Sequence, residues 1–227
     1  MSKATQINPG LVDQVFAPSS RPSPVTDCAE VNNLKLRFMQ SARAICPEFR
    51  ITPEQQPVIA AIFDWCIMRP GRLDPHKGLW LHGEIGSGKT TMLHIVRHFC
   101  RDHRPQFLPG NPYSFRISNA IEVCSEFSRK GYDGIDTYIN ANCQAFDELG
   151  SESSPTGYYG TAENVFQYIL QRRYERRHSS FTHVTTNFTV EEIPSLYGAR
   201  IYDRCRELFN FVELNGESFR QSKETRI

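Results

Sequence analysis

The sequence predicts an α/β fold built around a parallel sheet. Three observations predict it. A short apolar run, Leu79 to Leu81, leads into a glycine-rich loop and then into a segment with apolar residues at helical spacing. Two further strand candidates, residues 143–149 and 181–187, end in polar side chains, and helical patterns separate the strands. The strand 181–187 is expected to lie between the strand before the glycine-rich loop and the strand 143–149. Strands that alternate with helices are typical of parallel sheets covered by helices.

The glycine-rich loop fits the phosphate-loop pattern G-x-x-x-x-G-K-[ST]. Its glycines let backbone N–H groups turn toward one anion, and the following helix adds its positive end. Lys89 is expected to reach the β- and γ-phosphates of a nucleotide, and the Thr90 hydroxyl to ligate Mg²⁺. The residues assigned to nucleotide binding are Gly83, Glu84, Ile85, Gly86, Ser87, Gly88, Lys89, Thr90 and Thr91. A turn that merely joins strand to helix does not explain the lysine and two threonines.

A second chemical motif is Asp147-Glu148 at the end of the strand candidate 143–149. In phosphate-loop hydrolases such an Asp orients the Mg²⁺ shell, and the adjacent Glu polarises the attacking water. Both carboxylates must stand at the carboxyl end of their strand, where ligands bind in parallel sheets. The alternative is that Asp147 and Glu148 merely form a solvated turn. The glutamate also argues against a small-molecule kinase, which must keep water from attacking.

Composition narrows the class of protein. Among 227 residues, 39% are hydrophobic and the formal net charge is +1, so nucleic-acid contact must come from local patches. Seven cysteines without a C-x-x-C pair suggest neither a zinc site nor a disulfide framework. No apolar run of about 18 residues and no leader pattern is present, so we expect a cytoplasmic protein with no membrane contact.

The chain divides into a flexible arm over 1–30, a helix and linker over 31–50, an ATPase domain over 51–220 and a tail over 221–227. The basic amphipathic helix in 31–50 could dock on a partner or on DNA, and the alternative is that it packs against its own domain.

Helices are expected over 31–45, 119–130 and 164–177, and directly after the phosphate loop, where Lys89 and the two threonines stand at the helix start. A further helix is expected from Thr52, a capping residue followed by Gln55 three positions later, to about residue 69, and Pro57 can delay its regular part by a turn. Residues 197–209 are expected to form a turn and a helix. Further strands are expected at 114–118 and 211–214. The stretches 105–112, 131–140 and 151–162 are expected to be irregular, the last of them mobile. Thr189 to Glu192 forms a capping box at a short helix.

Two basic helix ends are candidates for DNA contact. One carries Arg97, Arg101 and Arg104, and the other spans Arg172 to Arg177. Cations are favoured at helix C-termini whatever the function, so structural roles remain open for both.

At this point the motifs together resemble a known family. The order of the phosphate loop, FDELG at 146–150, TTNFTVEEI at 185–193, YGARIYDR at 197–204 and NGESFR at 215–220 is similar to the AAA+ ATPases of the DnaC/IstB group. These are helicase loaders and ATP-binding helpers of transposases. The resemblance covers about residues 50–220. It implies a three-layer α/β/α sandwich with about five parallel strands and no C-terminal lid domain.

The resemblance also implies residue roles. Asn187 matches the position that senses the γ-phosphate, Arg204 is similar to the arginine finger that completes a neighbouring subunit's site, and Arg200 accompanies it. The catalytic set is then Glu148, Asn187, Arg204 and Arg200, and Thr90 and Asp147 hold Mg²⁺. The alternative for Arg200 and Arg204 is a pair of surface ion pairs with Asp203 and Glu207.

These expectations describe an ATPase that uses ATP and Mg²⁺, oligomerises through its arginine finger, and loads a replicative DNA helicase onto single-stranded DNA. Turnover by the isolated chain is expected to be slow. A transposase helper that acts on duplex DNA is an alternative from the same family. A nucleotide-dependent binding module, in which hydrolysis is incidental, is an alternative from a different class.

Overall fold

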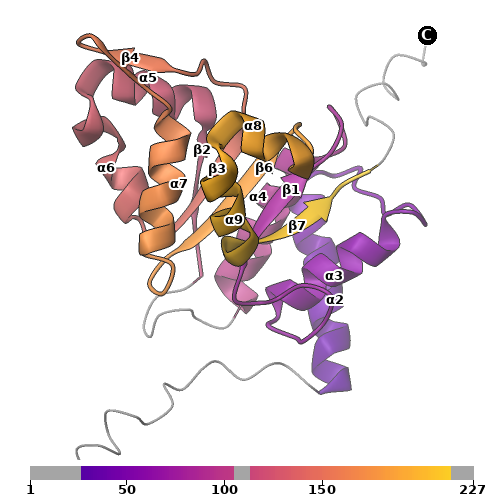
Figure 1. Ribbon diagram of the computed structural model, residues 1–227. Helices are drawn as coiled ribbons and strands as arrows, with labels where there is room; N and C mark the ends of the chain where they lie inside the picture. Colours follow the sequence, from indigo (N-terminus) through magenta and orange to yellow (C-terminus); the bar gives the residue numbers. More distant parts are fainter. Residues whose placement is uncertain (1–26, 105–112, 216–227) are drawn as a thin grey trace, which may run out of the picture.

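The computed structural model describes residues 27–104 and 113–215. Five parallel strands form one sheet in the order β2-β3-β6-β1-β7 (Figure 1). The strands are β1 (Gly78–His82), β2 (Arg116–Asn119), β3 (Cys143–Leu149), β6 (Phe181–Thr186) and β7 (Phe209–Glu213). The predicted parallel α/β sheet is therefore confirmed, with β6 between the phosphate-loop strand β1 and the Asp-Glu strand β3, as expected.

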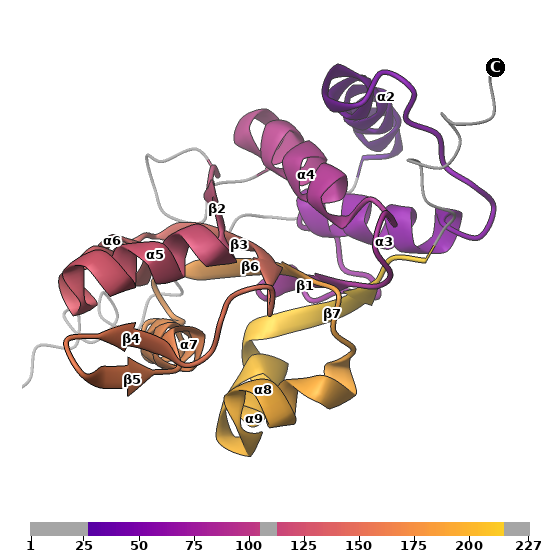
Figure 2. The same ribbon diagram turned by 90° about the horizontal axis from the view of Figure 1, so that it is seen from above.

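Helices cover both faces of this sheet, as Figure 2 shows. On one face lie α2 (Cys28–Ile45), α3 (Gln56–Cys66) and α4 (Lys89–His103). The other is covered by α5 (Ala120–Lys130), α6 (Tyr132–Asn140), α7 (Val165–Glu175), α8 (Ile193–Tyr197) and α9 (Ala199–Leu208). The alternation of side chains along β1 serves both layers, because Leu79 and Leu81 join the first core and Trp80 joins the second.

Helix α2 packs on its own domain. Its buried residues Val31, Leu34, Phe38 and Ala42 recur at helical spacing. The ring of Phe38 lies 5.3 Å from that of Phe99 on α4. The helix begins at Cys28, because the Asp27 carboxylate accepts hydrogen bonds from the first-turn N–H groups of Ala29 and Glu30. Residues 28–30 thus belong to a helix and not to the expected arm, and residues 1–26 of that arm lie outside the described residues.

Two segments expected to be irregular have regular structure. Residues 132–140 form α6, whose Ile135, Tyr138 and Ile139 enter the core. Gly134 lets α6 approach α5, because a Cβ there would stand 2.4 Å from the Glu126 carbonyl oxygen. In the second segment, β4 (Thr156–Tyr158) and β5 (Thr161–Glu163) form an antiparallel hairpin. The expected connector 105–112 lies outside the described residues.

Helix α3 begins at Gln56, later than the capping residue Thr52 suggests, although the box between Thr52 and Gln55 is present. A 3₁₀ turn, η1 (Val190–Glu192), precedes α8 and carries the predicted capping box with Thr189. In the part of the chain that the structure describes, no helix is long and apolar enough to span a membrane.

Candidate functional site

The phosphate loop lies between β1 and α4, and two glycines impose its shape. Gly83 and Gly88 have φ angles of 142° and 88°, a region that residues with a Cβ rarely adopt. A Cβ on Gly83 would also stand 2.3 Å from the Leu214 carbonyl oxygen. Gly88 caps α4, so the loop's last N–H groups point out from the positive end of that helix.

The Lys89 side chain folds back over this loop. Its Nζ donates to the carbonyl oxygens of Gly83 at 2.8 Å and Glu84 at 2.7 Å. Burial lowers the pKa of Lys89 from its usual value, and the negative charges of Asp147 and Glu148 partly oppose that shift. The ammonium group is therefore held at the loop by weak carbonyl acceptors, which a phosphate could replace with stronger, charged ones.

The hydroxyl of Thr90 meets the end of β3. Thr90 Oγ1 donates to Asp147 Oδ1 at 3.0 Å, and the Thr185 hydroxyl on β6 donates to the same oxygen. Three separate elements thus converge on one carboxylate. Sequence analysis expected Thr90 and Asp147 to act together, and the fold places them in direct contact.

Glu148 stands beside this pair in an unusual backbone conformation. Its φ is 58°, and its N–H donates to Thr185 Oγ1 at 2.9 Å. Oε2 of Glu148 accepts from the Asn119 side-chain amide at 2.9 Å. Sequence reasoning missed Asn119 as a site residue, because its place before a helix is that of an ordinary N-cap. It does cap α5, through its Oδ1, which accepts from the Ile121 N–H at 2.9 Å.

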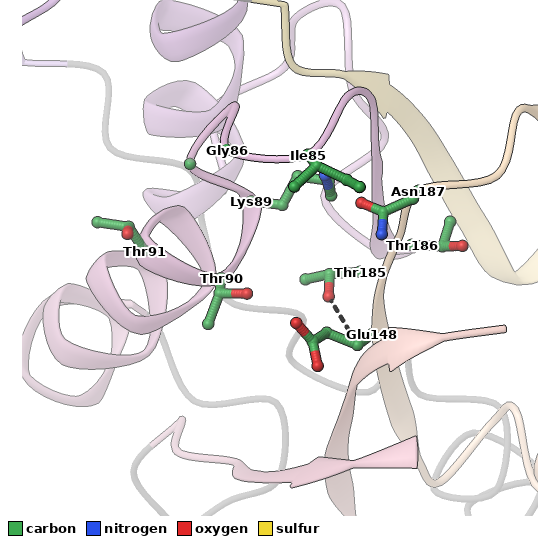
Figure 3. A pocket seen from close by; sticks show the side chains of 10 residues that line it. Ile85, Gly86, Lys89, Thr90, Thr91, Glu148, Thr185, Thr186 and Asn187 are labelled. Carbon is green, nitrogen blue, oxygen red and sulfur yellow. Dashed lines mark hydrogen bonds between the residues drawn. The ribbon is translucent and has the colours of Figure 1, made fainter. Parts of the chain in front are cut away.

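A cavity of about 170 Å³ opens in front of these groups. In Figure 3, Thr90 and Glu148 face each other across it, and Thr185 and Asn187 come from the neighbouring strand end. The lining residues are Ile85, Gly86, Gly88, Lys89, Thr90, Thr91, Glu148, Thr185, Thr186 and Asn187. Asn187 therefore reaches the same cavity as the phosphate loop. Of the loop residues, Glu84 is exposed and Ser87 is buried, and neither lines the cavity.

A smaller hollow of about 70 Å³ adjoins this cavity and shares Gly88 and Thr91 with it. Its wall is mainly apolar. It is lined by Cys46, Phe49, Gln55, Ile59, Ser87, Gly88, Thr91, Met92 and Leu214. Residues of the linker before α3 and of the stretch after β7 therefore close one side of the loop.

Arg200 and Arg204 do not line the cavity of their own chain. Both lie on α9, where Arg200 is exposed and Arg204 is half-buried. Within residues 27–104 and 113–215, neither forms an ion pair, so the alternative of pairs with Asp203 and Glu207 is not observed. Arg204 instead stacks on the ring of Tyr174, with its Cζ 4.9 Å from the ring centroid.

Two arginines proposed for DNA contact have structural roles, which corrects the expectation. Arg173 is fully buried and donates to Thr182 Oγ1 and to four backbone carbonyls, two in the last turn of α6, one directly after α6 and one at the start of β6. Arg104 is 5% exposed, stacks on Trp65 and donates to the Pro75 carbonyl oxygen at 2.6 Å. A DNA strand cannot reach either guanidinium.

Comparison with known proteins supports the fold. No family model matches the chain. The crystal structure of the DnaC helicase loader superposes with a TM-score of 0.56 at 17% identity, over 79% of this chain and 99% of that one. The chain has a fold similar to that of the DnaC helicase loader.

Other solved structures superpose less closely. DnaI gives a TM-score of 0.47 at 23% identity, over 81% of this chain and 83% of that one. AMPPCP-bound DnaA from Aquifex aeolicus gives a TM-score of 0.47 at 15% identity, over 78% of this chain and 52% of that one. The likeness to DnaC confirms the predicted α/β fold and agrees with the resemblance to the DnaC/IstB group.

Proposed function

We propose that this chain binds ATP with Mg²⁺ and hydrolyses it. The observation that carries the proposal is the contact between Thr90 Oγ1 and Asp147 Oδ1 at 3.0 Å, directly beside Glu148 and Lys89. The chemistry of phosphoryl transfer needs a cation for the phosphates, oxygen ligands for a metal and a carboxylate for water. Side chains for all three tasks line or adjoin one cavity.

The two oxygen donors, Thr90 and Asp147, suit Mg²⁺ better than they suit a metal ion whose ligands all come from the protein. Mg²⁺ keeps several waters and binds through one or two protein oxygens and the phosphates of its substrate. Thr90 and Asp147 supply those two oxygens. In the described part of the chain, no group of three or more His, Cys, Asp or Glu residues could hold a metal ion. When bound, Mg²⁺ would neutralise charge on the phosphate oxygens.

The chain's own groups divide the remaining tasks. Lys89 exchanges its carbonyl acceptors for phosphate oxygens, Glu148 accepts a proton from the attacking water, and Asn187 hydrogen-bonds that water or the γ-phosphate. Thr185 hydrogen-bonds both the Asp147 carboxylate and the Glu148 N–H, and so fixes the two acidic residues relative to each other. The apolar hollow beside the loop suits the flat face of a nucleotide base.

Self-assembly brings an arginine to the γ-phosphate. Arg204 and Arg200 lie outside the cavity of their own chain, so they act on the γ-phosphate held by a neighbouring copy. Hydrolysis is therefore slow in the monomer and faster in an oligomer.

We propose that the ATPase acts in DNA replication as a DnaC-like loader of the replicative helicase and that it binds single-stranded DNA. Support for a single-strand contact comes from the β4–β5 hairpin. Tyr159 at its tip is 94% exposed, and Tyr158 lies 4.8 Å from it, ring to ring. Helix α5, which packs against β4, ends in the exposed cations Arg129 and Lys130, and both of them share the single carboxylate of Glu126. Exposed aromatic rings near cations are typical of surfaces on which unpaired bases stack.

The first experiment separates binding from hydrolysis. Lys89→Ala should abolish ATP binding, whereas Glu148→Gln should keep binding and lose turnover by a factor of about 100 or more. Thr91→Ser is a matched control, because it retains a hydroxyl at a position outside the metal pair. If Glu148→Gln hydrolyses ATP like the unsubstituted chain, the catalytic assignment is wrong and the binding-module alternative gains.

The second experiment concerns the partner. Size-exclusion chromatography with light scattering, with and without ATP and Mg²⁺, should detect several copies on the replicative helicase. Absence of that complex, together with ATP-dependent assembly on duplex DNA, would favour the transposase-helper alternative.

A further inference from the structure

Arg204 is an arginine without a counterion, although an acid lies one helical turn away. In the described ranges Arg204 has no ion pair, and its Nη1 is buried without a hydrogen-bond partner. Glu207 is three residues further along α9, the spacing at which opposite charges on a helix ordinarily pair. The absence of this pair requires a physical reason.

Tyr174 on α7 provides the reason, because it contacts both groups. Its hydroxyl donates to Glu207 Oε2 at 2.9 Å and so ties one of the two carboxylate oxygens to α7. The guanidinium groups of Arg204 and Arg177 stack on its ring, with their Cζ atoms 4.9 Å and 4.4 Å from the ring centroid. The Glu207 hydrogen bond is also the main reason why the pKa of Tyr174 is raised. The negative ring face holds a cation without neutralising it.

We propose that Tyr174 is a positioning residue that holds the half-buried Arg204 guanidinium on its ring, unpaired and available to an anionic phosphate of a neighbouring copy. This inference rests on the proposed function, in which Arg204 acts in trans. Tyr174 touches neither the cavity of its own chain nor the carboxylates Asp147 and Glu148. A substitution of Tyr174 should therefore lower turnover when it is in the subunit that donates Arg204. It should have no effect in the subunit that binds the nucleotide.

A mixed-oligomer assay separates these two roles. Donor subunits carry Lys89→Ala, so they contribute only Arg204. Acceptor subunits carry Arg204→Ala, so they contribute only an intact phosphate site. Each variant alone should be nearly inactive, and the mixture should hydrolyse ATP. If the mixture stays inactive, the assignment of Arg204 as a finger in trans fails, and the inference about Tyr174 falls with it.

The test of Tyr174 uses the same mixture. Tyr174→Phe in the donor keeps the ring but frees Glu207 to pair with Arg204, and turnover should fall about two- to fivefold, as expected for competition by a surface ion pair. Adding Glu207→Gln to that donor removes the competitor and should restore turnover. Tyr174→Phe in the acceptor should have no effect.

If the mixture is active, three outcomes would overturn the inference about Tyr174 and leave the role of Arg204 intact. The first is a Tyr174→Phe donor that works as well as the unsubstituted donor. The second is a loss of turnover that Glu207→Gln does not restore. The third is an equal loss when Tyr174→Phe is placed in the acceptor, as a general packing defect would cause. Thermal unfolding of Tyr174→Phe checks independently that the fold is retained.

Discussion

The side-chain amide of Asn119 donates to Oε2 of Glu148 at 2.9 Å, across the paired ends of strands β2 and β3. Because one oxygen of the Glu148 carboxylate accepts this bond, the bond must break before that oxygen can contact an attacking water. The same asparagine caps α5, so its two functions use different atoms. Asn119 thus restrains the proposed base while it starts a helix.

Replacing Asn119 with Thr should raise the basal rate of ATP hydrolysis about threefold, since threonine keeps a capping oxygen but lacks the amide donor. Steady-state turnover without DNA or partner measures this change. Asn119→Asp is the companion variant, because it also keeps the cap and places a negative charge beside Glu148. A Thr variant whose turnover is unchanged or reduced would show that the amide does not restrain the base.

Tyr159→Ala should weaken binding to single-stranded DNA by about 1–3 kcal/mol, the usual contribution of one stacked base. Tyr159→Phe retains the ring and should bind within about twofold of the unsubstituted chain. Fluorescence anisotropy at two salt concentrations measures both affinities. ATP turnover without DNA is the control and should not change, because the hairpin tip lies outside the cavity. Equal losses for both variants would argue against stacking.

Arg173→Met should lower the free energy of unfolding by about 3 kcal/mol or more, because several buried carbonyl oxygens lose their donor. The adjacent Arg172 is exposed and pairs with Glu175 on the surface, so the stability of Arg172→Ala should stay within about 0.5 kcal/mol of that of the unsubstituted chain. Urea unfolding of the two variants measures this contrast. Similar stabilities would mean that water replaces the Arg173 hydrogen bonds.

Stability should also fall in acid because of His183. Burial lowers its pKa to about 3, and the charges of Arg104 and Arg173 add to that shift. The unfolded chain, with a histidine pKa of about 6.5, binds more protons between these values, so protonation favours unfolding as pH falls.

The slope of unfolding free energy against pH should therefore be smaller in His183→Gln, by up to about 1.4 kcal/mol per pH unit between pH 4 and 6. Comparing slopes cancels the constant cost of losing the bonds to Leu79 and Tyr113. Parallel slopes for the two proteins would mean that His183 does not remain neutral in the folded state.

Local sequence patterns were sufficient to predict the strand, loop and helix around Lys89 and the strand that ends in Asp147-Glu148. Glycines that must adopt positive φ, and apolar residues at regular spacing, leave a signal in a short window of sequence. The position of β6 between β1 and β3 also agrees with expectation. Helix α6 was missed because Gly131 and Gly134 suggest a loop, whereas close packing on α5 uses the second glycine.

Arginines show the limit of such patterns. Arg172 and Arg173 are neighbours at one helix end, yet one is exposed and the other is fully buried. The sequence indicates only that a cation is favourable there. Which of the two enters the interior depends on carbonyl groups at the ends of α6 and β6, which are more than thirty and about eight residues away.

The sequence by itself determined the parallel α/β fold, the phosphate loop and the residue types available for nucleotide chemistry, because these depend on backbone conformation and periodicity over short stretches. Only the tertiary structure decided that Thr90, Asp147 and Thr185 meet, that Asn119 holds Glu148, and that Tyr174 separates Glu207 from Arg204. Such contacts join side chains from different elements over a few ångströms, and their geometry depends on how the helices and strands pack together.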